Sequence, residues 1–175
     1  LNAIAEGKIE SGDEKKLNAL KGETMAVIAL CQFDLTRCFG YPYTKDKGAS
    51  LGAPLIDHLV GTYENPPRST VAQAYDFIIE TLEEAVTLMS EEKNNGRMNK
   101  YAARALLARI YLYHDDNRKA FDLADQLIKD ADTSGSYALY PHEKYVAAWS
   151  VEAKFGSESF FEIANSVDDT PGRDS

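Results

Sequence analysis

Apolar residues recur at steps of three and four through most of residues 14–131, and this spacing constrains the fold more than any other feature. The spacing places apolar side chains on one face of an α-helix, and that face must pack against another element. Four runs follow the pattern, and polar, glycine-rich or proline-rich stretches separate them. The sequence therefore predicts a mainly α-helical fold.

The first run lies between residues 11 and 40. Ser11 and Glu14 have the spacing of a capping box that starts a helix, and Gly40 marks its end. Gly22 lies inside the run and predicts either a break or a close contact with a neighbouring helix. We expect the apolar face to consist of Leu17, Leu20, Thr24, Val27, Ile28, Cys31, Leu35, Cys38 and Phe39.

The cysteines Cys31 and Cys38 both lie on this first helix. Their separation corresponds to a rise of roughly 10.5 Å, whereas a disulfide needs Cα atoms within about 7 Å. The two thiols therefore cannot pair, and we expect both to be buried as small apolar side chains.

Three further helical runs follow. Thr70 and Gln73 form a second capping box, and Asn99 can cap the next helix. The segment 101–113 (YAARALLARIYLY) is apolar almost all round, so we expect its neighbours to bury it on several sides. A polar turn at 115–117 precedes the last helix.

The segment from Tyr101 onward partly matches the tetratricopeptide repeat, with Leu107, Ala108, Tyr111 and Ala120 on pattern positions. Small residues let two antiparallel helices pack closely in such a repeat, and one helix pair cannot bury both faces alone. We predict tetratricopeptide-like helix pairs over about 11–90 and 99–131, within one domain spanning 1–175.

Two regions fall outside the helical pattern. Residues 41–69 are rich in proline and glycine and predict a loop of a length that is often functional. Residues 132–175 are expected to be irregular, with a short β segment at 159–164 because aromatic and β-branched residues gather there.

Charge narrows the range of partners. The chain has 28 acidic and 19 basic residues, for a net charge of −9. This balance argues against nucleic acid as a partner and against an anionic lipid surface. No run approaches the roughly 18 apolar residues of a membrane-spanning helix.

One literal catalytic motif is present. Gly48-Ala-Ser50-Leu-Gly52 matches the nucleophile elbow of serine hydrolases, but that motif needs a strand before the serine and a helix after it. The flanking residues predict neither, so we interpret the match as accidental. His58, His114 and His142 are far apart in the sequence and lack zinc-binding spacing, so we expect no metal and no cofactor.

Aromatic residues in the irregular regions are the remaining candidates. Tyr41, Tyr43 and Tyr63 lie in the 41–69 loop, and Trp149 follows Pro141. An exposed ring can stack on the C–H face of a sugar, so these four residues are candidate carbohydrate-binding residues. Local packing is the alternative explanation for each ring.

The motifs resemble, in sequence order, the SusD/RagB family of Bacteroidota surface lipoproteins. The resemblance covers roughly residues 14–163 and departs from the family pattern at Ile28 and Gln32. The matching segments are Gly22-Glu23, Phe33–Gly40 (FDLTRCFG), Gly52–Ile56 (GAPLI), Arg68–Val71 (RSTV), Tyr75–Ile78 (YDFI), Leu82–Ala85 (LEEA), Tyr101–Leu112 (YAARALLARIYL), Ala120, Ala124-Asp125, Tyr137–Tyr140 (YALY) and Glu158–Ile163 (ESFFEI).

The resemblance implies a helical, non-catalytic glycan-binding protein that takes part in nutrient import. It implies an oligosaccharide or polysaccharide ligand and a TonB-dependent outer-membrane transporter of the SusC type as partner. It also implies a surface-exposed lipoprotein of the outer membrane, whose lipid anchor this chain lacks, and it makes the chain the central fragment of a longer protein. A tetratricopeptide scaffold that binds a protein segment is the alternative, and a hydrolase using Ser50 is a third hypothesis.

Overall fold

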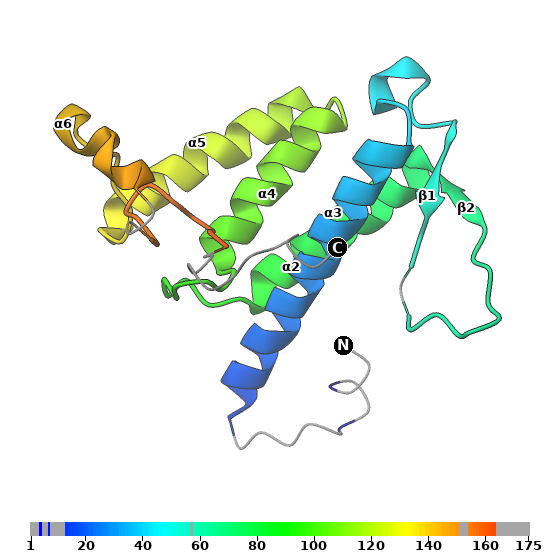
Figure 1. The fold of residues 1–175 in the computed structure, drawn as a ribbon, viewed down its shortest axis with the longest axis horizontal. Helices are drawn as coiled ribbons and strands as arrows, with labels where there is room; N and C mark the ends of the chain where they lie inside the picture. The colour runs from blue at the N-terminus through cyan, green and yellow to red at the C-terminus, as the bar shows by residue number, and fades with distance from the viewer. Residues whose placement is uncertain (1–3, 5–6, 8–12, 57, 151–153, 164–175) are drawn as a thin grey trace.

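The computed structural model describes residues 4, 7, 13–56, 58–150 and 154–163, and it is mainly helical, as predicted (Figure 1). Within that part of the chain, no helix combines the length and apolarity that crossing a membrane requires. In chain order the elements are α2 (Glu14–Phe39), η1 (Tyr43–Lys45), β1 (Leu51–Pro54), β2 (Arg68–Thr70), α3 (Val71–Leu88), α4 (Lys100–Tyr113), α5 (Asn117–Ser134), α6 (His142–Tyr145) and η2 (Ala147–Trp149).

Small side chains on α2 let it pack closely against α3. Gly22, Ala26 and Ala29 lie on the buried face of α2. A Cβ added to Gly22 would lie 2.9 Å from the carbonyl oxygen of Ala85 and 2.7 Å from Cγ of Met89. Gly22 therefore marks a close helix contact, one of the two roles that the sequence allowed.

The apolar face predicted for α2 lies opposite to the face that is buried. Leu20, Val27 and Leu35 are 37%, 42% and 41% exposed. Cys31 and Cys38 are free thiols, as expected, but they are exposed, so the prediction that they are buried was wrong. The prediction failed because α2 is apolar on two sides, and the side with small residues allows the closer approach to α3.

The capping residues are largely those that the sequence predicted. At the start of α3, Thr70 and Gln73 each accept a hydrogen bond from the other's backbone N–H, and Asn99 caps α4. The N-cap of α2 is Asp13, and Ser11, which the sequence predicted as the cap, lies outside the described residues. The Asp13 carboxylate reaches a free N–H of the first turn, which is the function of a helix cap.

α4 packs between α3 and α5 and is buried on several sides, as its composition predicted. Ala103 and Ile110 are fully buried on this helix. Nη1 of Arg104 donates to Oδ2 of Asp130 at 2.7 Å and links α4 to α5. α2, α3 and α4 share the main core, and a second cluster of Tyr101, Leu127, Ala131 and Tyr137 lies between α4, α5 and the segment after α5.

The segment predicted as a 41–69 loop contains regular structure. β1 and β2 form a two-stranded antiparallel sheet in which Leu51 pairs with Thr70. Arg68 strengthens the pairing because its Nε donates to the carbonyl of Gly52 at 2.7 Å. Gln32 of α2 is buried and donates from Nε2 to the carbonyl of Pro54 at 3.1 Å, so this departure from the family pattern holds the sheet against α2.

The short β segment predicted at 159–164 is wrong for its described part, because residues 159–163 are bends and irregular structure rather than a strand. Ala164 lies outside the described residues. A strand needs a partner strand for its backbone, whereas Ser159 N donates to the nearby carbonyl of Gly156 in a turn. Phe160 instead packs its ring against Tyr137, with ring centroids 4.8 Å apart.

Candidate functional site

The four aromatic residues predicted from the sequence do not form one site. Tyr41 and Tyr43 lie beside or within η1, Tyr63 lies between β1 and β2, and Trp149 ends η2. Figure 1 shows the β1–β2 arm and the α6 helix at opposite ends of the molecule. Trp149 is therefore separated from the other three rings, and each location has to be judged separately.

Trp149 is paired with a second exposed ring, Tyr145. The ring centroids are 6.1 Å apart and the rings meet edge to face, at 69°. Trp149 is 76% exposed and Tyr145 50% exposed. The neighbouring Val146 is 83% exposed, so these three side chains form one exposed apolar surface, which we call the aromatic platform.

Two short helical turns hold the aromatic platform in place. Pro141 precedes α6, and its carbonyl accepts a hydrogen bond from Lys144 N at 2.9 Å. The Trp149 N–H donates to the carbonyl of Val146 at 3.2 Å within the next turn. The sequence analysis missed Tyr145, although its place four residues before Trp149 puts the two rings about one helical turn apart.

The chemistry of the platform suits a ligand with an apolar face and a polar rim. The exposed ring face of Trp149 offers stacking area, and exposed polar side chains on α6, His142 and Glu143, can donate or accept hydrogen bonds nearby. A pyranose ring has this combination of C–H groups on one face and hydroxyls at its edge.

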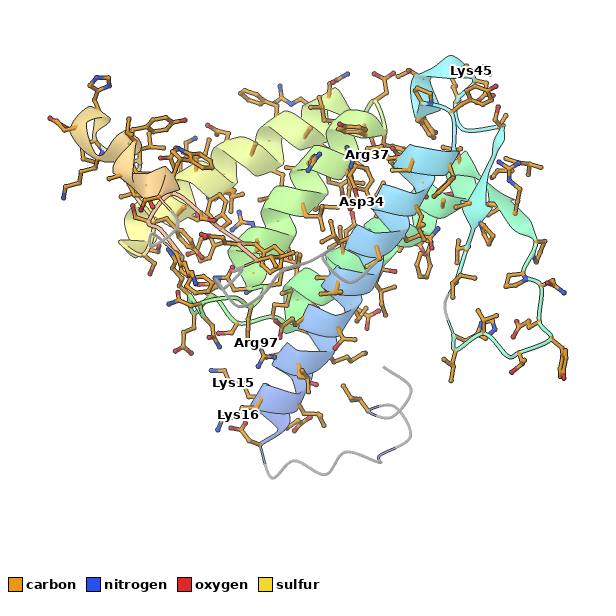
Figure 2. All side chains as sticks on the ribbon, viewed as in Figure 1. Lys15, Lys16, Asp34, Arg37, Lys45 and Arg97 are labelled. Atoms are coloured by element: carbon orange, nitrogen blue, oxygen red, sulfur yellow. The ribbon has the colours of Figure 1, made fainter. Side chains whose placement is uncertain are left out.

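Tyr41 is 57% exposed, but one face of its ring is already occupied. The ammonium of Lys45 lies 3.0 Å from the centroid of the Tyr41 ring (Figure 2, where Lys45 is labelled on η1). This cation–π contact stabilises the pair by about 0.5–1 kcal/mol at an exposed site. A sugar could stack on that face only by displacing Lys45.

Tyr43 is part of the packing rather than an exposed ring. Its centroid lies 4.1 Å from that of His114 and 5.6 Å from that of Tyr75. Tyr75 is buried, and this burial raises its pKa to about 12. For Tyr43, the local-packing alternative is therefore the one that the geometry supports.

Tyr63 is 95% exposed in the connection between β1 and β2, and Leu59 in the same connection is 91% exposed. The connection is held partly by His58 and Glu64, whose side chains bond at 2.7 Å. Tyr63 can therefore reach a large partner, but no second ring is paired with it among the described residues.

Ser50 lacks the geometry of a nucleophile elbow. It precedes β1 instead of following a strand, and a loop rather than a helix follows that strand. The Ser50 hydroxyl donates to the Asp46 carboxylate, and this hydrogen bond lowers the pKa of Asp46. The bond ties the hydroxyl to a carboxylate in a turn, which supports the interpretation that the motif match is accidental.

The protein consists of α-helical hairpins with a small two-stranded β arm, and solved structures of similar proteins have the same fold. The solved structure of a SusD superfamily protein from Bacteroides thetaiotaomicron is 40% identical, with a TM-score of 0.88 over 96% of this chain and 36% of that chain. A putative sugar binding protein from Bacteroides vulgatus is 38% identical, with a TM-score of 0.88 over 99% of this chain and 40% of that chain.

A family model described as SusD-like, "Starch-binding associating with outer membrane", matches residues 1–112. The chain therefore belongs to this SusD-like family. A laminarin binding SusD-like protein shares the fold at 23% identity, with a TM-score of 0.69 over 90% of this chain and 33% of that chain. No relative was found among curated protein sequences. The chain spans about two fifths or less of the length of these solved relatives.

Proposed function

We propose that this chain is part of a non-catalytic, cell-surface glycan-binding protein that captures nutrients for import. The observation that carries the proposal is the aromatic platform, which presents Trp149 and Tyr145 to solvent on a SusD-like fold. The sugar-binding and laminarin-binding names of two relatives support the same class of ligand. Its partner in this proposal is a SusC-like TonB-dependent transporter, and a lipid anchor outside residues 1–175 holds the protein at the outer membrane.

The single tryptophan of the chain gives a direct test of glycan binding at the platform. Maltooligosaccharides and laminarioligosaccharides are titrated separately while Trp149 fluorescence is recorded. We expect one of the two series to change the fluorescence and to saturate. Stacking on an indole moves water away from the ring, so a shift of the emission maximum is the expected signal.

Two variants localise this binding. Tyr145→Ala keeps the fluorescent reporter and should weaken binding about fivefold, because a ring contact contributes on the order of 1 kcal/mol. Phe121→Ala is the matched control, because Phe121 is also an exposed ring but lies on α5 and is not part of the platform. Unchanged fluorescence with both glycan series, together with tight binding of a peptide, would favour the protein-binding scaffold instead.

A further inference from the structure

α2 carries an apolar surface that the rest of the described chain leaves uncovered. We call it the outer stripe, and it consists of Leu20, Val27, Cys31, Leu35, Cys38 and Phe39. These residues follow one another at steps of seven, four, four, three and one, so they run along one side of the helix. The stripe extends from residue 20 to residue 39, which is about 28 Å of helix.

A helix that is apolar on two opposite sides is typical of the interior of a larger protein. The other side of α2, with Ala26, Ala29 and Phe33 fully buried, already packs against α3 and α4. In stacked helical repeats a terminal helix has a polar outer face, and an apolar outer face belongs to a helix with a neighbour on each side. By this criterion α2 is an inner helix.

α5, at the other end of the helical array in Figure 1, has a different outer surface. It exposes two apolar side chains, Phe121 and Ile128, but two ion pairs lie among them. Arg118 and Asp122 approach to 2.9 Å, and Lys129 and Asp125 to 2.6 Å. The outer stripe of α2 has no such pair within it, since both of its thiols are free and its other members are apolar.

The outer stripe continues into a groove at the C-terminal end of α2. Leu35 and Phe39 line both the stripe and the groove, which has a volume of about 560 Å³ and continues along β1 and the connection after it. Asp34 and Arg37, labelled on α2 in Figure 2, border this surface as an ion pair of 2.9 Å. These two charges are paired with each other, and the charged residue among the described lining of the groove, Arg68, donates to the backbone carbonyls of Gly52 and Leu51, so the contact area is mainly apolar.

We propose that the outer stripe of α2 is the docking surface for one amphipathic helix of the same polypeptide, contributed from outside residues 1–175. The length of the relatives supports this occupant, because about three fifths of each of the two most similar chains described above has no counterpart here. The steps of three and four along the stripe fit the side-by-side packing of a second helix. This inference rests on membership of the family, and it is independent of glycan binding.

The exposed thiols Cys31 and Cys38 are natural probes of the inference. In the isolated 175-residue chain, both should react with a thiol reagent at a rate close to that of the unfolded chain. In the complete gene product, both should react at least a hundredfold more slowly. Thr133→Cys in a Cys31→Ser, Cys38→Ser background is the control, because Thr133 is exposed on α5 and its thiol should react in both proteins.

A second variant tests the contact without relying on the thiols. Val27→Asp should leave the isolated chain folded, because Val27 is 42% exposed there, but should lower the melting temperature of the complete gene product. Equal thiol reactivity in the two proteins, or an unchanged melting temperature, would overturn the inference. A dimer of the isolated chain that protects both thiols and dissociates on Val27→Asp would assign the stripe to a second copy and overturn it as well.

A glycan titration of the complete gene product separates this inference from the proposed function. Protected thiols without any glycan binding would support the docked helix and contradict the glycan proposal. Reactive thiols with saturable glycan binding would support the glycan proposal and contradict the docked helix.

Discussion

At the scale of single residues, Gly22 is the position at which the sequence most directly sets the packing. It lies where α2 and α3 approach too closely for any Cβ, with the backbone of Ala85 on the other side. A backbone carbonyl cannot move aside as a flexible side chain can, so the helices themselves would have to separate. The helix propensity of glycine opposes this role, since alanine would stabilise an isolated helix by up to about 1 kcal/mol.

We therefore expect Gly22→Ala to destabilise the chain, despite the better helix propensity of alanine. Overpacking of a tight contact costs about 1–3 kcal/mol, and contact with a backbone atom favours the upper part of that range, so about 2 kcal/mol remains as a net loss after the gain in propensity. Urea denaturation followed by circular dichroism measures the difference. Gly61→Ala is the control, because a Cβ there meets nothing closer than 3.8 Å, and it should change stability by less than about 0.5 kcal/mol. Equal stability of the two variants would contradict the prediction.

At the scale of elements, Asn99 connects the start of α4 to two other parts of the chain. Its Oδ1 accepts from the Ala102 N–H at 3.0 Å, and its Nδ2 donates to the Tyr137 hydroxyl at 2.7 Å and to the Glu92 carbonyl at 3.3 Å. Asn99 is buried, so none of these partners has water as an easy replacement. The sequence predicted the cap, but it could not predict the contact with Tyr137.

Asn99→Ala should lower the free energy of unfolding by about 2–4 kcal/mol. A lost cap costs about 1 kcal/mol, and a buried polar group left without a partner costs about 1–3 kcal/mol. Tyr137→Phe removes the ring hydroxyl but keeps the cap and should cost less, about 1 kcal/mol. Thermal denaturation of both variants measures the two effects, and an equal loss in the two would show that the cap contributes nothing.

Elements whose signals are local were predicted well, and those that depend on distant partners were not. The capping box of Thr70 and Gln73 needs only four neighbouring residues, and the structure confirms it. The buried face of α2 depends on α3, which selects the small side of the helix over the larger apolar side. The strand expected near Phe160 needed a partner strand, and the ring found Tyr137 instead.

The candidate site also depends on residues that are distant in the sequence and that the sequence could not identify. The irregular sequence context made Tyr41, Tyr43, Tyr63 and Trp149 candidates but left exposure and local packing open, and Tyr41, Tyr63 and Trp149 are exposed. It could not indicate that Lys45 covers one face of Tyr41, or that Tyr43 turns inward against His114 and Tyr75. Sequence context could not decide between exposure and packing for any of these rings, because the side chains that cover a ring come from other parts of the chain.

At the scale of the whole molecule, carboxyls whose pKa is lower in the folded than in the unfolded chain make stability fall as the pH drops below about 4. Hydrogen bonds from Arg104, and then from Gln126, hold the pKa of Asp130 below its ordinary value of 3.8. Above pH 3.8 this carboxyl is ionised in both folded and unfolded chains, so its full stabilisation is present. As the pH falls below 3.8, the unfolded chain takes up the proton first, and the stabilisation is lost as the pH passes through the lower folded pKa.

Asp130→Asn should therefore be less stable than the parent chain at pH 7 and should lose less stability on acidification. Melting temperatures measured from pH 6 to pH 2.5 should converge for the two proteins at the acidic end, because the parent then carries a neutral carboxyl that binds Arg104 no better than an amide does. Arg104→Gln removes the main cause of the lowered pKa and should give a similarly flattened profile, since the ion pair links α4 to α5 and needs both partners. Parallel profiles for the parent and Asp130→Asn would mean that other carboxyls, such as Asp13 or Asp46, account for the acid sensitivity.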